Sequence, residues 1–341
     1  MTSLTWRQNT IPTQQTAIEL KCLQAMARID HISNRKWQYF RKHLNPFDFN
    51  HDHTVNRAFY KLWEILSVIP ELISSATPRT LHLAEAPGSF VQVVKTRFPQ
   101  SSCVAVSRPP DPEHGIQGFS AEVQALPDVE LRYLDLLSDL LKEHTLLFSK
   151  KKFDFISADG GIDEQGHYAK KESLHLKLIL AQIVYILTLQ RVDGSCILKL
   201  FETSSPTTHH LLYLLAKHYK KCTFIKPITS RPTNSERYFV CQGFTTNSDL
   251  SVQALIDLTQ EDDLEGKVLF DNIPVSFLCY IRKHTDTLTK RQTAHINKTV
   301  SVIHDLSRRR ETLDRNVTQS AKCRALYVWS NRFEYLTSDP T

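Results

Sequence analysis

The sequence lacks the glycine-rich loops that bind nucleotide phosphates in many α/β proteins. It contains neither the dinucleotide fingerprint GxGxxG nor the P-loop pattern GxxxxGK[ST]. Glycine is scarce throughout, at 9 of 341 residues. A nicotinamide-dependent enzyme and a nucleoside triphosphatase are therefore both disfavoured.

Metal-binding and disulfide patterns are also missing. The seven cysteines form no CxxC pair and no Cys/His cluster, so we expect neither a metal site nor a disulfide framework. This cysteine usage is typical of a reducing intracellular compartment, the cytoplasm or the nucleus.

Long apolar segments are not evident either. Residues 1–15 lack the apolar core of a signal peptide, and we expect no later window to reach the length of a membrane span. The sequence thus predicts a soluble protein without a membrane partner. The net charge of +6 is compatible with a nucleic-acid partner without establishing one.

What the sequence does contain is an alternation of short apolar runs and helical patterns over residues 55–245. This alternation predicts a mostly parallel sheet flanked by helices. The runs are TLHLAE, SCVAVS, VELRYLD, FDFISAD, SCILKLFE, CTFIKPI and RYFVCQGF. The linker TSRPTNSE between the last two runs is too short for a crossover helix, so these two should form an antiparallel hairpin. Residues 1–54 are interpreted as an N-terminal extension, and residues 246–341 as a mainly helical C-terminal region.

The first run ends in a turn of small residues, Glu85-Ala86-Pro87-Gly88-Ser89. Open α/β sheets bind ligands beyond the carboxyl ends of their strands. Gly88 and Ser89 would let a ligand approach the backbone, and the helix that begins there would offer free amides. The alternative is a plain connection between a strand and a helix.

Four charged residues fall at comparable places in this framework. Asp159 ends the fourth run, Lys199 lies inside the fifth, Glu236 begins the last, and Lys61 lies on the helix before the first. A lysine within an apolar strand is costly to bury without partners. The alternatives are a structural salt-bridge cluster or a lysine whose tip reaches solvent.

In their order and contexts, NRAxxK, SADGG, ILKxFE and SERYxV, these four residues resemble the K-D-K-E tetrad of the FtsJ-like ribose 2′-O-methyltransferases. The resemblance covers about residues 55–245. It implies a Rossmann-like methyltransferase fold with a seven-stranded, mostly parallel sheet whose last strand is antiparallel. The NRAxxK context and the long tail look closer to mRNA cap-specific enzymes, including those of large DNA viruses, than to bacterial ribosomal-RNA enzymes.

The resemblance also implies a cofactor, S-adenosylmethionine, which leaves as S-adenosylhomocysteine. The loop of Glu85, Ala86, Pro87, Gly88, Ser89 and Phe90 would surround its methionine and ribose, although many members have APGGF where this chain has APGSF. Asp135 resembles the acidic residue that accepts a hydrogen bond from the adenine amino group; it could instead cap a helix starting at LLSDLL. The second run ends in Ser107-Arg108, without the acidic residue that holds the ribose in many methyltransferases.

The four charged residues suit the chemistry that the family implies. A ribose hydroxyl must be oriented and deprotonated, and a lysine serves as a base if a nearby cation and burial lower its pKa. Lys199 is the candidate base and Lys61 the second cation. Asp159 and Glu236 would hold the two ammonium groups, and Asp159 would border both pockets. The four should titrate together, and no metal is needed.

The expected partner is RNA, most simply capped mRNA. The basic aromatic cluster Arg35–Lys42, with Arg108 and Arg231, could line a phosphate path, and Trp37 and Tyr39 could stack on bases. The alternatives are methylation of internal ribosomal or transfer RNA positions and a non-catalytic RNA-binding scaffold.

The C-terminal region carries apolar residues at helical spacing, so it should pack on the core or on a protein partner. These residues are Val275, Phe277, Leu278, Ile281, Ile296, Val300 and Ile303. Arg308, Arg309 and Arg310 should face solvent, within reach of RNA or an acidic partner.

Overall fold

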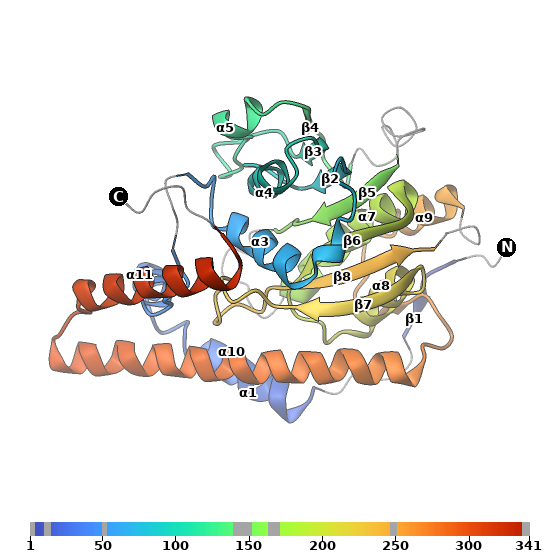
Figure 1. The fold of residues 1–341 in the computed structure, drawn as a ribbon. Helices are drawn as coiled ribbons and strands as arrows, with labels where there is room; N and C mark the ends of the chain where they lie inside the picture. Colours follow the sequence, from blue (N-terminus) through green and yellow to red (C-terminus); the bar gives the residue numbers. More distant parts are fainter. Residues whose placement is uncertain are drawn as a thin grey trace.

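The computed structural model describes residues 4–9, 15–49, 53–138, 152–162, 171–245 and 251–335. In these residues a seven-stranded sheet has the order β4-β3-β2-β5-β6-β8-β7 (Figure 1). The strands are β2 (Arg79–Leu83), β3 (Ser102–Ser107), β4 (Val129–Tyr133), β5 (Phe153–Ala158), β6 (Gln190–Leu200), β7 (Tyr219–Ile225) and β8 (Arg237–Phe244).

The strand directions confirm the predicted topology. Strands β4, β3, β2, β5 and β6 pair in parallel, whereas β8 is antiparallel to both of its neighbours, β6 and β7. The last two runs form the expected hairpin, and β8 is inserted between β6 and β7. The carboxyl ends of the parallel strands therefore meet the start of β8 at one edge of the sheet.

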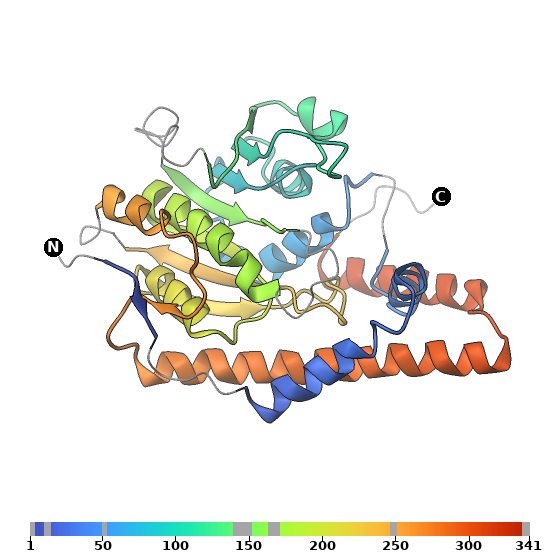
Figure 2. The same cartoon turned by 180° about the vertical axis from the view of Figure 1, so that it is seen from behind.

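Helices cover both faces of the sheet (Figures 1 and 2). On one face lie α3 (Ala58–Val68), α4 (Ser89–Arg97) and the short α5 (Ala121–Gln124), with a single 3₁₀ turn at Pro70–Leu72. On the other lie α7 (Lys171–Leu189) and α8 (Pro206–Ala216), with α9 (Val252–Leu258) against α7. Adjacent strand residues face opposite layers: Phe155 packs with the α3 and α4 side, and Ile156 with the α7 and α8 side. This two-sided burial explains why the runs are almost continuously apolar.

Helix α7 corrects one sequence expectation. Its segment Glu172–Leu189 is long and apolar enough to cross a membrane, so the expectation that no window reaches that length is wrong. However, 72% of this segment is buried inside the protein, where the helix covers the sheet. A buried core helix has the same length and composition as a span, and these alone do not indicate a membrane.

The N-terminal extension packs along the C-terminal region. Strand β1 (Arg7–Gln8) pairs with β9 (Lys267–Val268), and α1 (Ala17–Ala27) lies against α10 (Val275–Arg309). Helix α2 (Asn34–His43) covers the cluster Arg35–Lys42. Trp37 is only 3% exposed and packs in a core cluster with Ile296 and Val300 of α10. The expectation that Trp37 could stack on a base is therefore wrong, because its ring lies inside the protein.

The C-terminal region packs on the core, as its periodicity predicts. Helix α10 runs beneath the sheet, and α11 (Arg315–Arg332) returns toward α3 (Figure 1). Four of the expected contact residues, Ile281, Ile296, Val300 and Ile303, are buried, whereas Val275 at the start of α10 is 73% exposed. Arg308, Arg309 and Arg310 are exposed, as predicted. Their contact with RNA, and the division of the chain at 54/55 and 245/246, stay predictions.

Candidate active site

The small-residue turn after β2 has an unusual backbone. Ala84 and Gly88 have positive φ angles of 56° and 114°, and Gly88 immediately precedes α4. A Cβ atom at Gly88 would come within 2.6 Å of a methyl carbon of Val123 on α5. Glycine is thus required here by the conformation and by the packing of α5, and a bulky substitution at Gly88 would disturb the fold before it blocked any ligand.

The amides at the start of α4 are not free, which corrects the sequence interpretation. Oε1 of Glu85 accepts hydrogen bonds from the backbone amides of Phe90 (2.6 Å) and Val91 (3.2 Å). A carboxyl group within the same turn therefore takes the donors that a ligand was expected to use. Burial raises the pKa of Glu85 to about 8, and the nearby Asp159 carboxylate adds to this shift.

The other residues of the turn are largely enclosed. Phe90 is 1% exposed and belongs to the core on the α3 and α4 side. The Ser89 hydroxyl donates to Oδ1 of Asn56 at 2.8 Å, and the Ala86 amide donates to the Ser107 hydroxyl at 3.2 Å. These contacts join the turn to the start of α3 and to the end of β3. Cofactor contacts by residues 85–90 stay a prediction.

Asp135, two residues after β4, has partners that suit both of its interpretations. Its Oδ1 accepts from the amides of Leu137 (2.8 Å) and Ser138 (3.3 Å), as a helix cap would. Its Oδ2 pairs with Nε of Arg108 at 3.0 Å, which joins the ends of β4 and β3. The remainder of the LLSDLL segment lies outside the described residues, so its role as cap or as adenine acceptor stays open.

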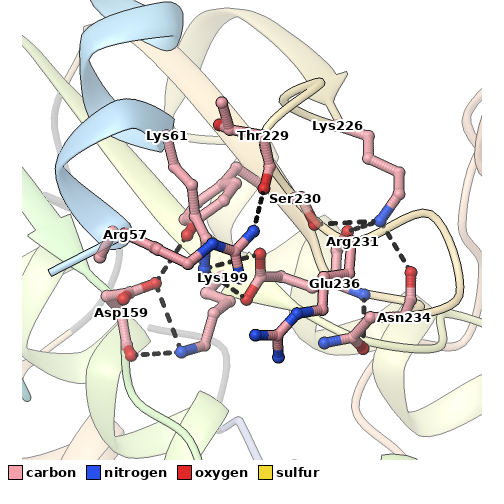
Figure 3. Close-up of polar contacts among 12 residues, drawn as sticks. Arg57, Lys61, Asp159, Lys199, Lys226, Thr229, Ser230, Arg231, Asn234 and Glu236 are labelled. Carbon is pink, nitrogen blue, oxygen red and sulfur yellow. Dashed lines mark hydrogen bonds and ion pairs between the residues drawn. The ribbon is translucent and has the colours of Figure 1, made fainter. Parts of the chain in front are cut away.

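The four charged residues meet at the carboxyl edge of the sheet as two ion pairs (Figure 3). Nζ of Lys61 on α3 lies 2.9 Å from both carboxylate oxygens of Glu236, which precedes β8. Nζ of Lys199 on β6 donates to the main-chain oxygen of Asp159 at 2.6 Å and lies 3.3 Å from its Oδ1. The sequence grouped these four residues correctly but did not assign the pairs.

The topology explains this convergence. Parallel pairing matches Ala158 of β5 with Leu198 of β6, so the next residues, Asp159 and Lys199, lie side by side. Antiparallel pairing matches Lys199 with Tyr238 of β8, which brings Glu236 to the same edge. Strand register thus brings Asp159, Lys199 and Glu236 together, and Lys61 is added from helix α3.

The site is largely shielded from water. The side chains of Lys61 and Lys199 are 13% and 11% exposed, and those of Glu236 and Asp159 are 8% and 16% exposed. Burial alone would raise the pKa of Glu236, but Lys61 and Lys199 outweigh it and hold that pKa well below its usual range. Glu236 is therefore ionised at neutral pH.

Two further residues at this edge of the sheet, Tyr238 and Lys226, were not identified from the sequence. The Tyr238 hydroxyl donates to Oδ1 of Asp159 at 2.8 Å, so one carboxylate oxygen contacts both Tyr238 and Lys199. Nζ of Lys226 donates to the main-chain oxygens of Asn234 and Glu236, both at 2.7 Å. Burial lowers the pKa of Lys226 to about 7. The SERYFV pattern did carry a signal for Tyr238, because residues two apart on a strand share a face.

Glu64, one turn after Lys61, joins three segments that are remote in sequence. Its Oε1 accepts from Nε1 of Trp329 on α11 at 2.9 Å and from the Thr229 amide at 3.0 Å. Its Oε2 accepts from the Ile228 amide at 2.7 Å. Burial raises the pKa of this carboxyl group. Glu64 thus ties the helix of Lys61 both to the loop before Glu236 and to the C-terminal region.

Arg231, expected on a phosphate path, is held within the protein. Its Nε lies 2.6 Å from Oδ2 of Asp48, and Nε of Arg57 lies 3.0 Å from Oδ1 of the same carboxylate. Asp48 is 3% exposed, so the two guanidinium groups neutralise a buried charge. Over the described ranges, no group of three or more His, Cys, Asp or Glu residues could hold a metal ion.

Comparison with known proteins places this chain in a family. A protein from Dictyostelium discoideum named cap-specific mRNA (nucleoside-2′-O-)-methyltransferase 1 is 24% identical over 302 residues, which is 77% of this chain and 40% of that protein. The human protein of the same name is 29% identical over 164 residues, or 46% and 19% of the two chains. The chain thus spans less than half the length of these two relatives.

Among solved structures, a ribosomal RNA methyltransferase from Plasmodium falciparum aligns with 56% of this chain and 99% of its own. The TM-score is 0.44 and the identity 19%. The family model described as FtsJ-like methyltransferase matches residues 54–244, a range that includes the whole seven-stranded sheet and all four charged residues. The chain belongs to the FtsJ-like methyltransferase family.

Proposed function

We propose that this chain is an S-adenosylmethionine-dependent RNA ribose 2′-O-methyltransferase that acts on the first transcribed nucleotides of capped mRNA, converting cap-0 to cap-1. The observation that carries the proposal is the pair of lysine–carboxylate contacts at the carboxyl edge of the sheet. The names of the two relatives above, both cap-specific mRNA methyltransferases, favour the cap over internal RNA positions.

The charges around the turn after β2 suit the proposed cofactor. Glu85 and Asp159 are close enough for one carboxylate to raise the pKa of the other, and a cationic ligand would relieve this repulsion. S-adenosylmethionine carries a cationic sulfonium and supplies the methyl group. Residues 85–90 and Asp159 would hold it, and Asp135 would be positioned for the adenine.

Lys199 is the proposed general base. To accept the proton of the ribose hydroxyl, its amine must be neutral when the substrate is bound. The Tyr238 hydroxyl donates to the same Asp159 oxygen that faces Lys199, so the two side chains share one carboxylate oxygen and fix its position.

Lys61 and Glu236 complete the proposed site. The contact with Glu236 fixes the Lys61 ammonium at the same edge of the sheet as Lys199, where it would serve as the second cation (Figure 3). Glu236, ionised at neutral pH, is the counter-ion of this second cation. In this arrangement, Asp159 orients the base and Glu236 orients the cation.

The test is methyl transfer to a short cap-0 RNA, followed by nuclease mapping of the modified nucleotide. We expect one methyl group on the ribose of a first transcribed nucleotide, and none on the same RNA with that 2′-hydroxyl already methylated. Equal methyl transfer to uncapped RNA would contradict the cap as target and favour an internal RNA position. If the protein bound RNA but transferred no methyl group even when saturated with S-adenosylmethionine, it would be a non-catalytic RNA-binding scaffold.

A further inference from the structure

A pocket lies beside the candidate site, between the end of α2, the loop that follows it, the β7–β8 loop and the middle of α10. It encloses about 460 Å³, a volume within the range of small-ligand sites. The residues that line it come from segments remote in sequence, including Phe47, Lys226, Pro232 and Gln292. The pocket is therefore a product of the packing of both terminal extensions on the sheet domain.

The pocket combines cations with apolar surface. Arg41, Lys226, Arg291, His295 and Lys298 line it, and none of the described lining residues is acidic. The other walls include Leu44, Pro46, Phe47, Ile228, Pro232 and Leu288. An anion with a flat or apolar part would satisfy both kinds of surface.

The cations on α10 are available to a ligand. Arg291, His295 and Lys298 follow each other at intervals of four and three residues, so they share one face of the helix. All three are exposed, and Arg291 and Lys298 form no ion pair within the described part of the chain. Asp48, a buried carboxylate that follows the lining residue Phe47, is already paired with Arg57 and Arg231.

The pocket shares a wall with the candidate active site. Lys226 lines the pocket, and its Nζ donates to the main-chain oxygen of Glu236, whose carboxylate binds Lys61 (Figure 3). On the other side, Nε2 of Gln292 on α10 donates to the main-chain oxygen of Thr233 at 3.4 Å. A ligand that occupied the pocket would thus lie next to the loop that positions Glu236.

We propose that this pocket holds one nucleotide of the RNA substrate other than the one that is methylated, with its base against the apolar wall and its phosphates against Arg291 and Lys298. The inference rests on the proposed function, because that function identifies the ligand as RNA. A single strand suits the pocket because its bases are unstacked and free to enter. His295, which lines the pocket between these two cations, would contribute a hydrogen bond.

The test compares two double variants of α10 that carry the same change of charge. In Arg291→Glu/Lys298→Glu both changed residues line the pocket; in the control, Lys283→Glu/Lys290→Glu, the residues have the same spacing and exposure but do not line it. Binding of a fluorescent single-stranded capped RNA is measured across a salt series. We expect the pocket variant to bind at least about tenfold more weakly, with a salt slope smaller by about 1.4, because each phosphate contact contributes about 0.7.

A second measurement asks whether a base enters the pocket. Removal of a single base should weaken binding to the unmodified protein at one position of the RNA, and this effect should vanish in the pocket variant. Both variants should keep the S-adenosylmethionine affinity of the unmodified protein, and the pocket variant should raise KM for RNA much more than it lowers kcat.

The outcomes separate this inference from the proposed function. Equal weakening by both double variants would mean a general effect of charge and would overturn the pocket proposal, as would unchanged binding by the pocket variant. If methyl transfer succeeds and the pocket variant behaves like the control, the pocket proposal alone fails. If the pocket variant selectively loses RNA but the unmodified protein transfers no methyl group, only the proposed function fails.

Discussion

Carboxyl groups on the two sides of the sheet edge have different neighbours. At the ends of β5 and β6 and the start of β8, Asp159 and Glu236 each contact a lysine ammonium. At the end of β2, Glu85 accepts hydrogen bonds from backbone amides, and Asp159 adds to the rise of its pKa. The first group has its charges balanced within the protein. The second group, the unbalanced side, contains a carboxyl group that keeps its proton near neutral pH and would lose it beside a cationic ligand.

The largest expected effect concerns the balanced side, where Asp159 and Glu236 each contact a lysine. Lys199→Ala should lower methyl transfer by a factor of about 10²–10⁴, the usual cost of removing a positioned base, and leave S-adenosylmethionine affinity nearly intact. Single-turnover assays and calorimetric titration measure the two effects. Lys221→Ala is the matched control, because Lys221 is an exposed lysine on β7. Near-normal turnover of the Lys199 variant would overturn its assignment as the base.

Asp159 lies where the two sides meet, so its loss should affect both. Asp159→Ala should reduce transfer about as strongly as the loss of Lys199 and, unlike that change, should also weaken cofactor binding. Asp154→Ala, at the other end of β5, is the control. If the Asp159 variant kept full cofactor affinity, Asp159 would contact Lys199 without taking part in cofactor binding.

Glu85 tests the unbalanced side through pH. A cationic ligand favours the ionised carboxyl group, so binding should release a proton, and cofactor affinity should rise by up to about tenfold per pH unit below pH 8. Calorimetry in buffers of different ionisation enthalpy measures that proton. In Glu85→Gln both effects should disappear, whereas Glu122→Gln on the surface should keep them. Binding without proton release would place the cofactor cation away from Glu85.

The same group predicts how stability without ligand depends on pH. Because the pKa of Glu85 is about 8 in the folded protein and 4.5 in a free side chain, the folded state binds the extra proton between these values. The free energy of unfolding should therefore fall as pH rises from about 4.5 to 8, by at most about 1.4 kcal/mol per unit. Denaturant titrations of Glu85→Gln should show a smaller slope, and an equal slope in both proteins would contradict the raised pKa.

The smallest expected effect concerns the support of the balanced side. Trp329→Phe keeps an aromatic ring at this position of α11 but removes the donor to Glu64 on α3, which should lower the free energy of unfolding by about 1–2 kcal/mol. A small displacement of Lys61 should reduce kcat by a factor of about 2–10. Trp6→Phe, which removes the indole donor to Leu258 on α9, is the control for kcat. Equal kcat in both variants would mean that α11 supports the fold without positioning the site.

The sequence predicted the sheet, its antiparallel last strand and the grouping of the four charged residues. It could do so because strand ends converge by topology, and apolar runs mark the strands. The capping of α4 by Glu85 was missed, since a carboxyl group in a turn has the same sequence signature whether it faces a ligand or its own backbone. The burial of Trp37 was missed because its partners, Ile296 and Val300, lie on a helix more than 200 positions away. Pairing within the tetrad depends on side-chain directions that spacing alone does not fix.

The hydrogen bond between Glu64 and Trp329 also has a consequence for the order of folding. It spans 265 positions of the chain, and contacts of such separation form late because loop closure must precede them. Until α11 docks, Glu64 lacks one of the donors that satisfy its buried carboxyl group, and its side-chain contacts are then those with Ile228 and Thr229 of the β7–β8 loop. The chain would thus acquire a sheet early and a competent arrangement of Lys61 and Glu236 only in its final folding step, so that refolding monitored by sheet content should run ahead of recovered activity.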